Sequence, residues 1–276
     1  MYLTRMRSLL PLAAALVFVS AAGAVGPSLP AEDGVSVGTT AVSFVTHVGS
    51  DRTTELTMRE HGRAVRTVEL PGSWGVPLVA YGARPGGLSP NGRVLVLSDA
   101  VDVTGRLRAH SRFAVVDTRT LAITRTISLR GDYSFDALSP QARTLFLIHH
   151  VSNADPTRYQ VQAYDLKLGR LLPRVIADRE QEGWIMNGYP VARTTETGGR
   201  WVYTLYEQSD NYPFVHALDT VGRTAVCIGV PSGTNWDESW IGSAKLRLSG
   251  GKLLIEQPNG KLRYTLDTQT FRISAV

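Results

Sequence analysis

The sequence is poor in cysteine. Among its 276 residues only Cys227 carries a thiol, so the chain forms no disulfide within itself. The segment around it, TAVCIGV, is apolar and resembles a strand, which indicates a buried and inert side chain. A small domain held together by disulfides is therefore excluded, and the stability of the protein must come from a hydrophobic core.

Helical patterns are almost absent after residue 35. Apolar residues form short runs or alternate with polar ones, and β-branched and aromatic residues are common among them. The 26 glycines and 14 prolines lie mostly between these runs, where turns are expected. The sequence therefore predicts an all-β fold.

Catalytic and metal-binding motifs are also missing. The chain has no G-x-S-x-G motif, no glycine-rich phosphate loop and no Cys–His pairing suited to catalysis. His149 and His150 are adjacent, so a strand would point them to opposite faces and they could not hold one metal ion together. His47, His110 and His149 could still meet in a site built from several loops. The sequence assigns no cofactor, no metal ligand and no catalytic residue.

The charge distribution gives no sign of nucleic-acid binding. The formal charge is +5, without a run of basic residues. The first residues combine Arg5 and Arg7, an apolar run over 9–19 and a small-residue end at Ala24, which is the pattern of a secretory signal peptide. We expect a signal peptide over 1–24, a linker over 25–33 and one domain over 34–276, in a secreted or periplasmic protein. An uncleaved membrane anchor is the alternative, although the run is shorter than the roughly 20 residues that span a bilayer.

A turn followed by a short apolar strand recurs along the chain at intervals of roughly 50 residues. In each copy a small or polar turn leads through a basic residue into the strand. The copies are LSPNGRVLVL (88–97), LSPQARTLFLI (138–148), TTETGGRWVYTLY (194–206) and LRLSGGKLLIE (246–256). A more degenerate copy fits residues 41–70, which gives five units. For the second unit the predicted strands are 77–83, 93–98, 112–117 and 122–129.

A second marker accompanies each unit, because an aspartate ends one apolar strand just before a short turn into the next. An aspartate there can accept a hydrogen bond from a backbone amide two residues later and so close the turn. We therefore expect a structural role for Asp117, Asp165, Asp219 and Asp267.

The pattern SPNGRVLVL followed by VVDTRT resembles the YVTN and WD-type β-propeller repeat families. The resemblance implies a β-propeller of four-stranded antiparallel blades, most simply five of them, and implies no particular activity. In such a meander the turns after the first and third strands lie on one face, and all other connections lie on the opposite face. The C-terminal FRISAV segment could share a sheet with the first unit to close the ring.

The connections between units are long and carry most of the tryptophans. The aromatic and acidic residues that we expect at this face are Trp74, Tyr133, Trp184, Tyr189, Trp236, Asp237 and Trp240. They could form a binding surface at the channel mouth, because stiff aromatic side chains supply contact area in binding sites. The alternative is that they fill the wedge-shaped space between neighbouring blades.

The functional hypothesis is an exported propeller that binds a protein, peptide or carbohydrate through its long-loop face. The alternative is an extracytoplasmic hydrolase, lactonase-like or glycosidase-like, with its site at the channel mouth. Its acids would come from the set Asp51, Asp99, Asp102, Asp155, Asp210 and Asp237. A membrane is expected as a partner only through an uncleaved signal segment.

Overall fold

The computed structural model describes most of the chain outside the N-terminal segment. The described residues are 34–36, 41–80, 83–100, 106–180, 183–208, 212–231 and 238–276. The predicted signal peptide and linker lie outside these ranges.

The described chain folds into five antiparallel sheets, numbered here in chain order. Sheet 1 contains β1 (Val35–Ser36), β2 (Val42–Val48), β3 (Thr53–Glu60) and β4 (Arg63–Pro71). Sheet 2 contains β5 (Trp74–Gly75), β6 (Val94–Asp99), β7 (His110–Asp117) and β8 (Ala122–Arg130). Sheet 3 contains β9 (Asp132–Leu138), β10 (Thr144–His150), β11 (Arg158–Asp165) and β12 (Arg170–Ile176), with the short β13 (Met186–Asn187) added beside β11. Sheet 4 contains β14 (Tyr189–Thr195), β15 (Trp201–Glu207), β16 (Phe214–Asp219) and β17 (Thr224–Gly229). Sheet 5 contains β18 (Lys245–Ser249), β19 (Lys252–Glu256), β20 (Leu262–Asp267) and β21 (Ile273–Ala275), preceded by the 3-10 helix η1 (Glu238–Ser243).

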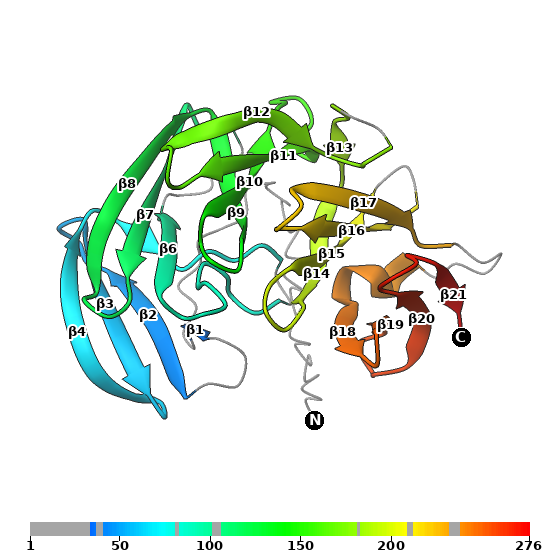
Figure 1. Cartoon of the computed structure of the whole chain (residues 1–276), viewed down its shortest axis with the longest axis horizontal. Coiled ribbons are helices and arrows are strands. Elements are labelled where there is room, and N and C mark those ends of the chain that lie inside the picture. Colours follow the sequence, from blue (N-terminus) through cyan, green and yellow to red (C-terminus); the bar gives the residue numbers. More distant parts are fainter. Residues whose placement is uncertain are drawn as a thin grey trace, which may run out of the picture.

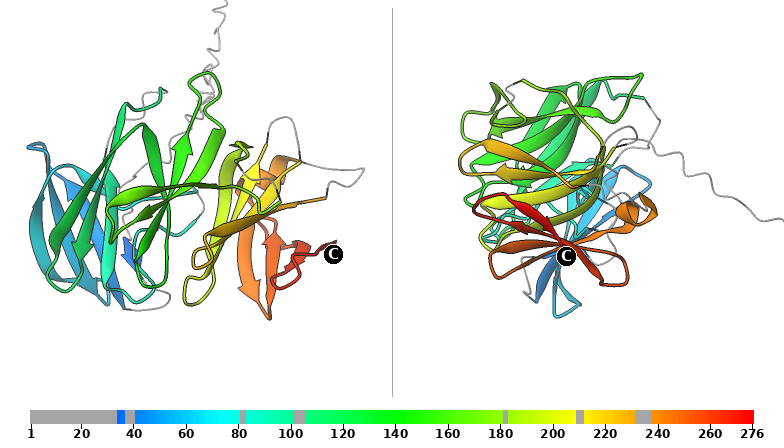
Figure 2. Two further views of the ribbon diagram at one scale, coloured as in Figure 1. Left: turned by 45° about the horizontal axis from the view of Figure 1, so that its top comes forward. Right: turned by 90° about the vertical axis from the view of Figure 1, so that its right-hand side faces the viewer.

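Each sheet is a meander in which consecutive strands pair. The sheets follow one another along an arc, with β9 and β14 toward its middle and β4, β8, β12 and β17 on its outside (Figure 1). Sheets 1 and 5 lie at opposite ends of the molecule (Figure 2). This arrangement of four-stranded antiparallel sheets is that of a β-propeller, as the sequence predicted.

Two details differ from the sequence prediction. The first strand of sheet 2 is Trp74–Gly75 and not 77–83, because Pro77 has no N–H for a ladder and its carbonyl accepts from the Gly86 amide in an irregular segment. The C-terminal strand β21 pairs with β20 inside its own sheet, so it shares no sheet with the first unit. Five blades in a closed ring stays a prediction, since no hydrophobic cluster of the described residues joins sheets 1 and 5.

Apolar side chains between neighbouring sheets hold the arc together. One cluster joins sheets 1 and 2 around Leu56 and Leu95, and another joins sheets 4 and 5 around Leu205 and Ile255. The largest cluster packs sheet 3 between sheets 2 and 4, and every residue of β9 is buried. Sheet 3 is therefore covered on both faces, and a buried polar group on it needs a hydrogen-bond partner within the protein.

Short turns gather on one face of the arc, which we call the turn face. The Thr118 amide donates to the Arg93 carbonyl (3.1 Å), which joins the turn after β7, the third strand of sheet 2, to the turn that leads into β6. Equivalent bonds join Thr220 to Arg200 (2.9 Å) and Thr268 to Gly251 (3.0 Å). These contacts place the turns named in the sequence prediction together on one face.

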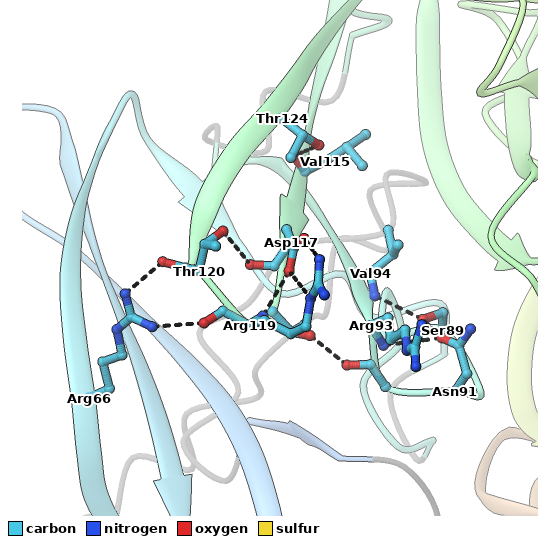
Figure 3. A network of polar contacts seen from close by, with 12 residues as sticks. Arg66, Ser89, Asn91, Arg93, Val94, Val115, Asp117, Arg119, Thr120 and Thr124 are labelled. Carbon is cyan, nitrogen blue, oxygen red and sulfur yellow. Dashed lines mark hydrogen bonds and ion pairs between the residues drawn. The ribbon is translucent and has the colours of Figure 1, made fainter.

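The four turn aspartates make the contacts that the sequence pattern suggests. Asp117 Oδ1 accepts from the Arg119 amide (2.9 Å) (Figure 3). In the same way, Asp219 Oδ1 accepts from the Val221 amide (3.0 Å). The matching bonds are those of Asp165 with the Lys167 and Leu168 amides and of Asp267 with the Gln269 and Thr270 amides. The hydrogen bonds from Arg119 lower the pKa of Asp117 to about 2.

Arginines on the outer strands connect two of these turns, those of Asp117 and Asp165, to the preceding sheet. Arg66 of β4 donates from Nη1 to the Arg119 carbonyl (2.8 Å) and from Nη2 to the Thr120 carbonyl (2.9 Å) (Figure 3). Arg125 of β8 repeats the contact one sheet further, to the Leu166 carbonyl (2.6 Å). Some of the arginines that are scattered along the sequence thus connect neighbouring sheets.

Candidate functional site

The long connections meet on the opposite face, which we call the loop face. Asn187 lies where three of them converge: its side chain contacts the Thr157 hydroxyl, and its carbonyl accepts from Gln208 Nε2 (2.7 Å). Thr157 belongs to the β10–β11 connection, Asn187 to the connection between sheets 3 and 4, and Gln208 to the β15–β16 connection. Loops from two sheets are therefore joined into one surface, the Asn187 junction.

A second contact extends this surface to sheet 2. The Leu107 amide, in the segment before β7, donates to Asn153 Oδ1 (3.1 Å) in the β10–β11 connection. The loop face thus continues across sheets 2, 3 and 4, as expected if long connections share one face.

Two exposed aromatic side chains belong to the connections that are joined at the Asn187 junction. Trp184 precedes β13 and is 40% exposed, whereas Tyr212, in the β15–β16 connection, is 61% exposed. Tyr189, the first residue of β14, is partly exposed. Trp184 and Tyr189 belong to the set chosen from the sequence. Tyr212 was missed because the sequence argument considered aromatics only in the connections between units.

Three other residues of that set have buried side chains. Trp74 is 2% exposed, donates from Nε1 to the Pro71 carbonyl (2.7 Å) and is covered by the Arg112 guanidinium, 5.1 Å from its ring. Tyr133 stacks on His149 with ring centres 4.3 Å apart, and Trp240 packs in the cluster between sheets 4 and 5. These side chains fill the space between sheets, which is the packing role left open by the sequence. Trp236 and Asp237 lie outside the described residues.

Two buried ion pairs lie on β9, which the sequence argument treated as a connection between units. Arg108 donates from Nε to Asp132 Oδ1 (2.8 Å) and joins sheet 2 to sheet 3. Arg193 of β14 donates from Nη1 to Asp136 Oδ1 (2.8 Å) and from Nη2 to the Asp136 carbonyl (2.5 Å), which joins sheet 3 to sheet 4. The partners are 24 and 57 residues apart in sequence, so no local sequence motif predicts these ion pairs.

The neighbouring histidines of β10 point to opposite faces, as predicted. His149 stacks on Tyr133, while Nε2 of His150 lies 3.5 Å from Ser134 Oγ. Burial lowers the pKa of both imidazoles, and the charge of Asp132 partly opposes this effect. A serine beside a histidine is the arrangement of a nucleophile and its base. However, Ser134 is only 7% exposed, and Arg108 Nη2 also lies 3.4 Å from its hydroxyl oxygen.

The acids considered for hydrolysis do not converge where the structure describes them. Asp99 pairs with Arg112 (2.7 Å), and Asp51 and Asp155 each close a local turn through a threonine two residues later. Asp102, Asp210 and Asp237 lie outside the described residues. His47, His110 and His149 come from three different sheets, and no group of three or more His, Cys, Asp or Glu among the described residues could hold a metal ion. Nor does the described part contain a helix long and apolar enough to cross a membrane.

Comparisons with known proteins concern the fold. No protein family and no curated protein sequence matches the chain. A structure of hydrazine synthase from Kuenenia stuttgartiensis superposes with a TM-score of 0.51 at 15% identity, over 83% of this chain and 62% of that chain. The Dos1 propeller gives 0.46 at 9% identity over 84% and 55%, and the Cps50 (Swd1) β-propeller domain of Myceliophteria thermophila gives 0.46 at 13% over 87% and 70%. This chain thus spans less than two thirds of the first of these structures, and at such identities the likeness extends to the fold alone.

Proposed function

We propose that the protein is an exported β-propeller that binds a protein or peptide partner through its loop face. The observation that carries the proposal is the Asn187 junction, where three long connections are joined beside the exposed rings of Trp184 and Tyr212. A rigid frame that holds loops in fixed positions is a common basis for binding sites. The signal peptide expected over 1–24 supports a location of this surface outside the cytoplasm.

The chemistry of the surface favours a protein or peptide over a small molecule. Aromatic side chains and arginine are enriched in the centre of protein interfaces. Trp184 and Tyr212 offer large apolar surfaces with a polar edge, and Arg158, exposed at the start of β11, lies beside Asn187 in the strand register. An extended peptide or a loop of a partner could contact all three side chains.

The test begins with identification of the partner. The mature protein is used for affinity capture from the extracytoplasmic fraction, the captured protein is purified, and its Kd is measured by calorimetry. The double variant W184A/Y212A should raise the Kd by at least about 30-fold, the loss typical of interface hot-spot residues. Its melting temperature should stay unchanged because both side chains are exposed.

A matched control is available on the turn face. Leu168 and Val221 are 59% and 58% exposed and lie in the β11–β12 and β16–β17 turns. The double variant L168A/V221A should leave the Kd unchanged. If this control loses affinity and W184A/Y212A keeps it, the partner binds the turn face and the proposal is wrong.

Export is tested separately. Mass spectrometry of the protein recovered from the extracytoplasmic fraction should find a new N-terminus after Ala24. A full-length chain in the membrane fraction would instead support the uncleaved anchor.

A further inference from the structure

A polar row crosses the face of sheet 4 that packs against sheet 3. The residues in register along it are Arg193, Thr204, His216 and Cys227. Sheet 3 and its following segment supply an acid at each end. Asp136 accepts from Arg193 (2.8 Å), and Asp178 accepts from the Cys227 amide (2.6 Å). Hydrogen bonds therefore occupy both ends of the row, and His216 lies between them.

Aromatic rings connect the middle of this row to sheet 3. Tyr159 of β11 stacks on Tyr206 of β15 with centres 5.0 Å apart, and Tyr206 meets His216 edge-on at 6.4 Å. Burial raises the pKa of Tyr206, and the nearby charge of Asp136 raises it further. We call Asp136, Tyr159, Arg193, Tyr206 and His216 the sheet 3–4 joint.

Three polar atoms of the joint have no hydrogen-bond partner among the described residues. They are Asp136 Oδ2, Tyr159 OH and His216 Nε2. Their residues are 2%, 1% and 2% exposed. Buried polar atoms in folded proteins are nearly always paired, and an unpaired one costs the free energy of its lost hydration. Three such atoms between the same two sheets point to a shared partner.

The donor and acceptor roles of these atoms can be assigned. Asp136 Oδ2 belongs to the carboxylate that forms an ion pair with Arg193, so it is an acceptor. His216 forms a hydrogen bond with the Ala177 backbone; since Nε2 has no partner, Nδ1 donates that bond and Nε2 is the accepting nitrogen. Tyr159 OH can donate. The joint therefore presents two acceptors and one donor.

We propose that one water molecule is bound in the sheet 3–4 joint, where it donates to Asp136 Oδ2 and His216 Nε2 and accepts from Tyr159 OH. A water has two donor hydrogens and accepting lone pairs, so it matches this set. A metal ion fits less well, because the Arg193 guanidinium already pairs with the same carboxylate (2.8 Å).

The position of this site gives the water a structural consequence. Tyr159 is in register with Met186, next to Asn187, so the joint lies directly below the Asn187 junction. A bound water would fix the distance between sheets 3 and 4 beneath that junction. The inference does not depend on the proposed function.

A double-mutant cycle tests the shared partner. Tyr159→Phe removes the donor, and His216→Asn removes the accepting Nε2 while keeping an amide N–H near the position of Nδ1. Each variant of the full chain should lower the folding equilibrium constant in urea by roughly three- to tenfold. The double variant should lose at least threefold less than the product of the two, because both changes act on one water.

The control cycle pairs His216→Asn with Tyr264→Phe, whose hydroxyl donates to the Pro231 carbonyl (2.7 Å) in another part of the molecule. These two effects should multiply. If Tyr159→Phe and His216→Asn also multiply, or if Tyr159→Phe leaves the equilibrium constant unchanged, the proposal is overturned.

A direct observation covers the case in which a variant does not fold. A crystal structure of the unmodified protein at a resolution that shows ordered water should contain one water within hydrogen-bond distance of all three atoms. A dry joint, a metal ion identified by anomalous scattering, or a direct bond from Tyr159 OH to Asp136 would each overturn the inference.

Discussion

Replacement of Arg193 by methionine should destabilise the protein strongly, because the change leaves a buried carboxylate without its cation. The side chains of Arg193 and Asp136 are 9% and 3% exposed, so the bulk solvent does not reach the carboxylate to replace its lost cation. The change also leaves the Asp136 carbonyl and the Thr204 hydroxyl without the donors they have now. Breaking such a buried pair costs about 3–5 kcal/mol.

The expected loss corresponds to a fall in melting temperature of about 6–20 °C for a domain of this size. Thermal unfolding followed by circular dichroism, together with urea titration, measures it. The control is Arg247→Ala, which removes an ion pair with Glu256 from an arginine that is 58% exposed, and should cost no more than about 1 kcal/mol.

The result that would refute this reasoning is an Arg193→Met variant as stable as Arg247→Ala. A second comparison separates charge from packing. The double variant D136L/R193M has no unpaired charge and should recover much of the loss, since apolar residues of similar volume often replace buried ion pairs without cost.

Four further outcomes follow from other parts of the molecule. Burial lowers the pKa of His216 below its usual 6.5, so the unfolded chain takes up a proton at a higher pH than the folded protein does. The free energy of unfolding should therefore fall by up to about 1.4 kcal/mol per pH unit below pH 6.5. Urea midpoints at pH 7.5 and 5.5 measure this change, and a higher midpoint at pH 5.5 would contradict it. Ala142 has a φ of 50°, so Ala142→Gly should raise stability by about 1 kcal/mol in the same assay, and a loss would refute the strain. The backbone amide of Leu168 holds the pKa of Asp165 below its usual 3.8, so Asp165→Ala should lower the urea midpoint at pH 7, and this difference should shrink as the pH falls below 3.8 through the lowered pKa; a difference that stays constant with pH would refute the turn role. Burial raises the pKa of Cys227 to about 12, so it should react with a thiol reagent only on unfolding, and fast reaction in the native state would disagree.

The repeating part of the fold could be predicted because short, local sequence patterns determine it. The strands predicted at 93–98, 112–117 and 122–129 correspond to β6, β7 and β8, which begin and end within two residues of those limits. A turn, an apolar strand and a closing aspartate lie within one short segment, so their contacts are local. The turn that lacks glycine keeps the same conformation, since the Ala142 amide donates to the Ser139 carbonyl (2.8 Å) as the Gly92 amide does to that of Ser89.

The candidate site was less accessible to sequence reasoning. The segment RGDYSFDA contains two acids and was interpreted as a connection, yet it forms the buried strand β9 because arginines from two other sheets pair with Asp132 and Asp136. Such pairing depends on the tertiary fold and leaves no periodic signal. For the aromatic residues the sequence could not predict exposure, because tryptophan and tyrosine occur both in the packed space between sheets and at exposed binding surfaces. Only the three-dimensional structure distinguishes Trp74, which is buried, from Trp184, which is exposed.

The polar residues of the molecule therefore fall into two groups with different roles. Asp132, Asp136 and Ser134 are buried on β9, where their contacts join neighbouring sheets. A general base or nucleophile must reach its substrate, and these groups are 1%, 2% and 7% exposed, which argues against the hydrolase alternative at this strand. The polar contacts of the second group, at Asn187, join loops rather than sheets and lie beside exposed rings. The buried ion pairs join the sheets that carry those loops, so we expect the proposed recognition by the loop face to depend on the sheet 3–4 joint.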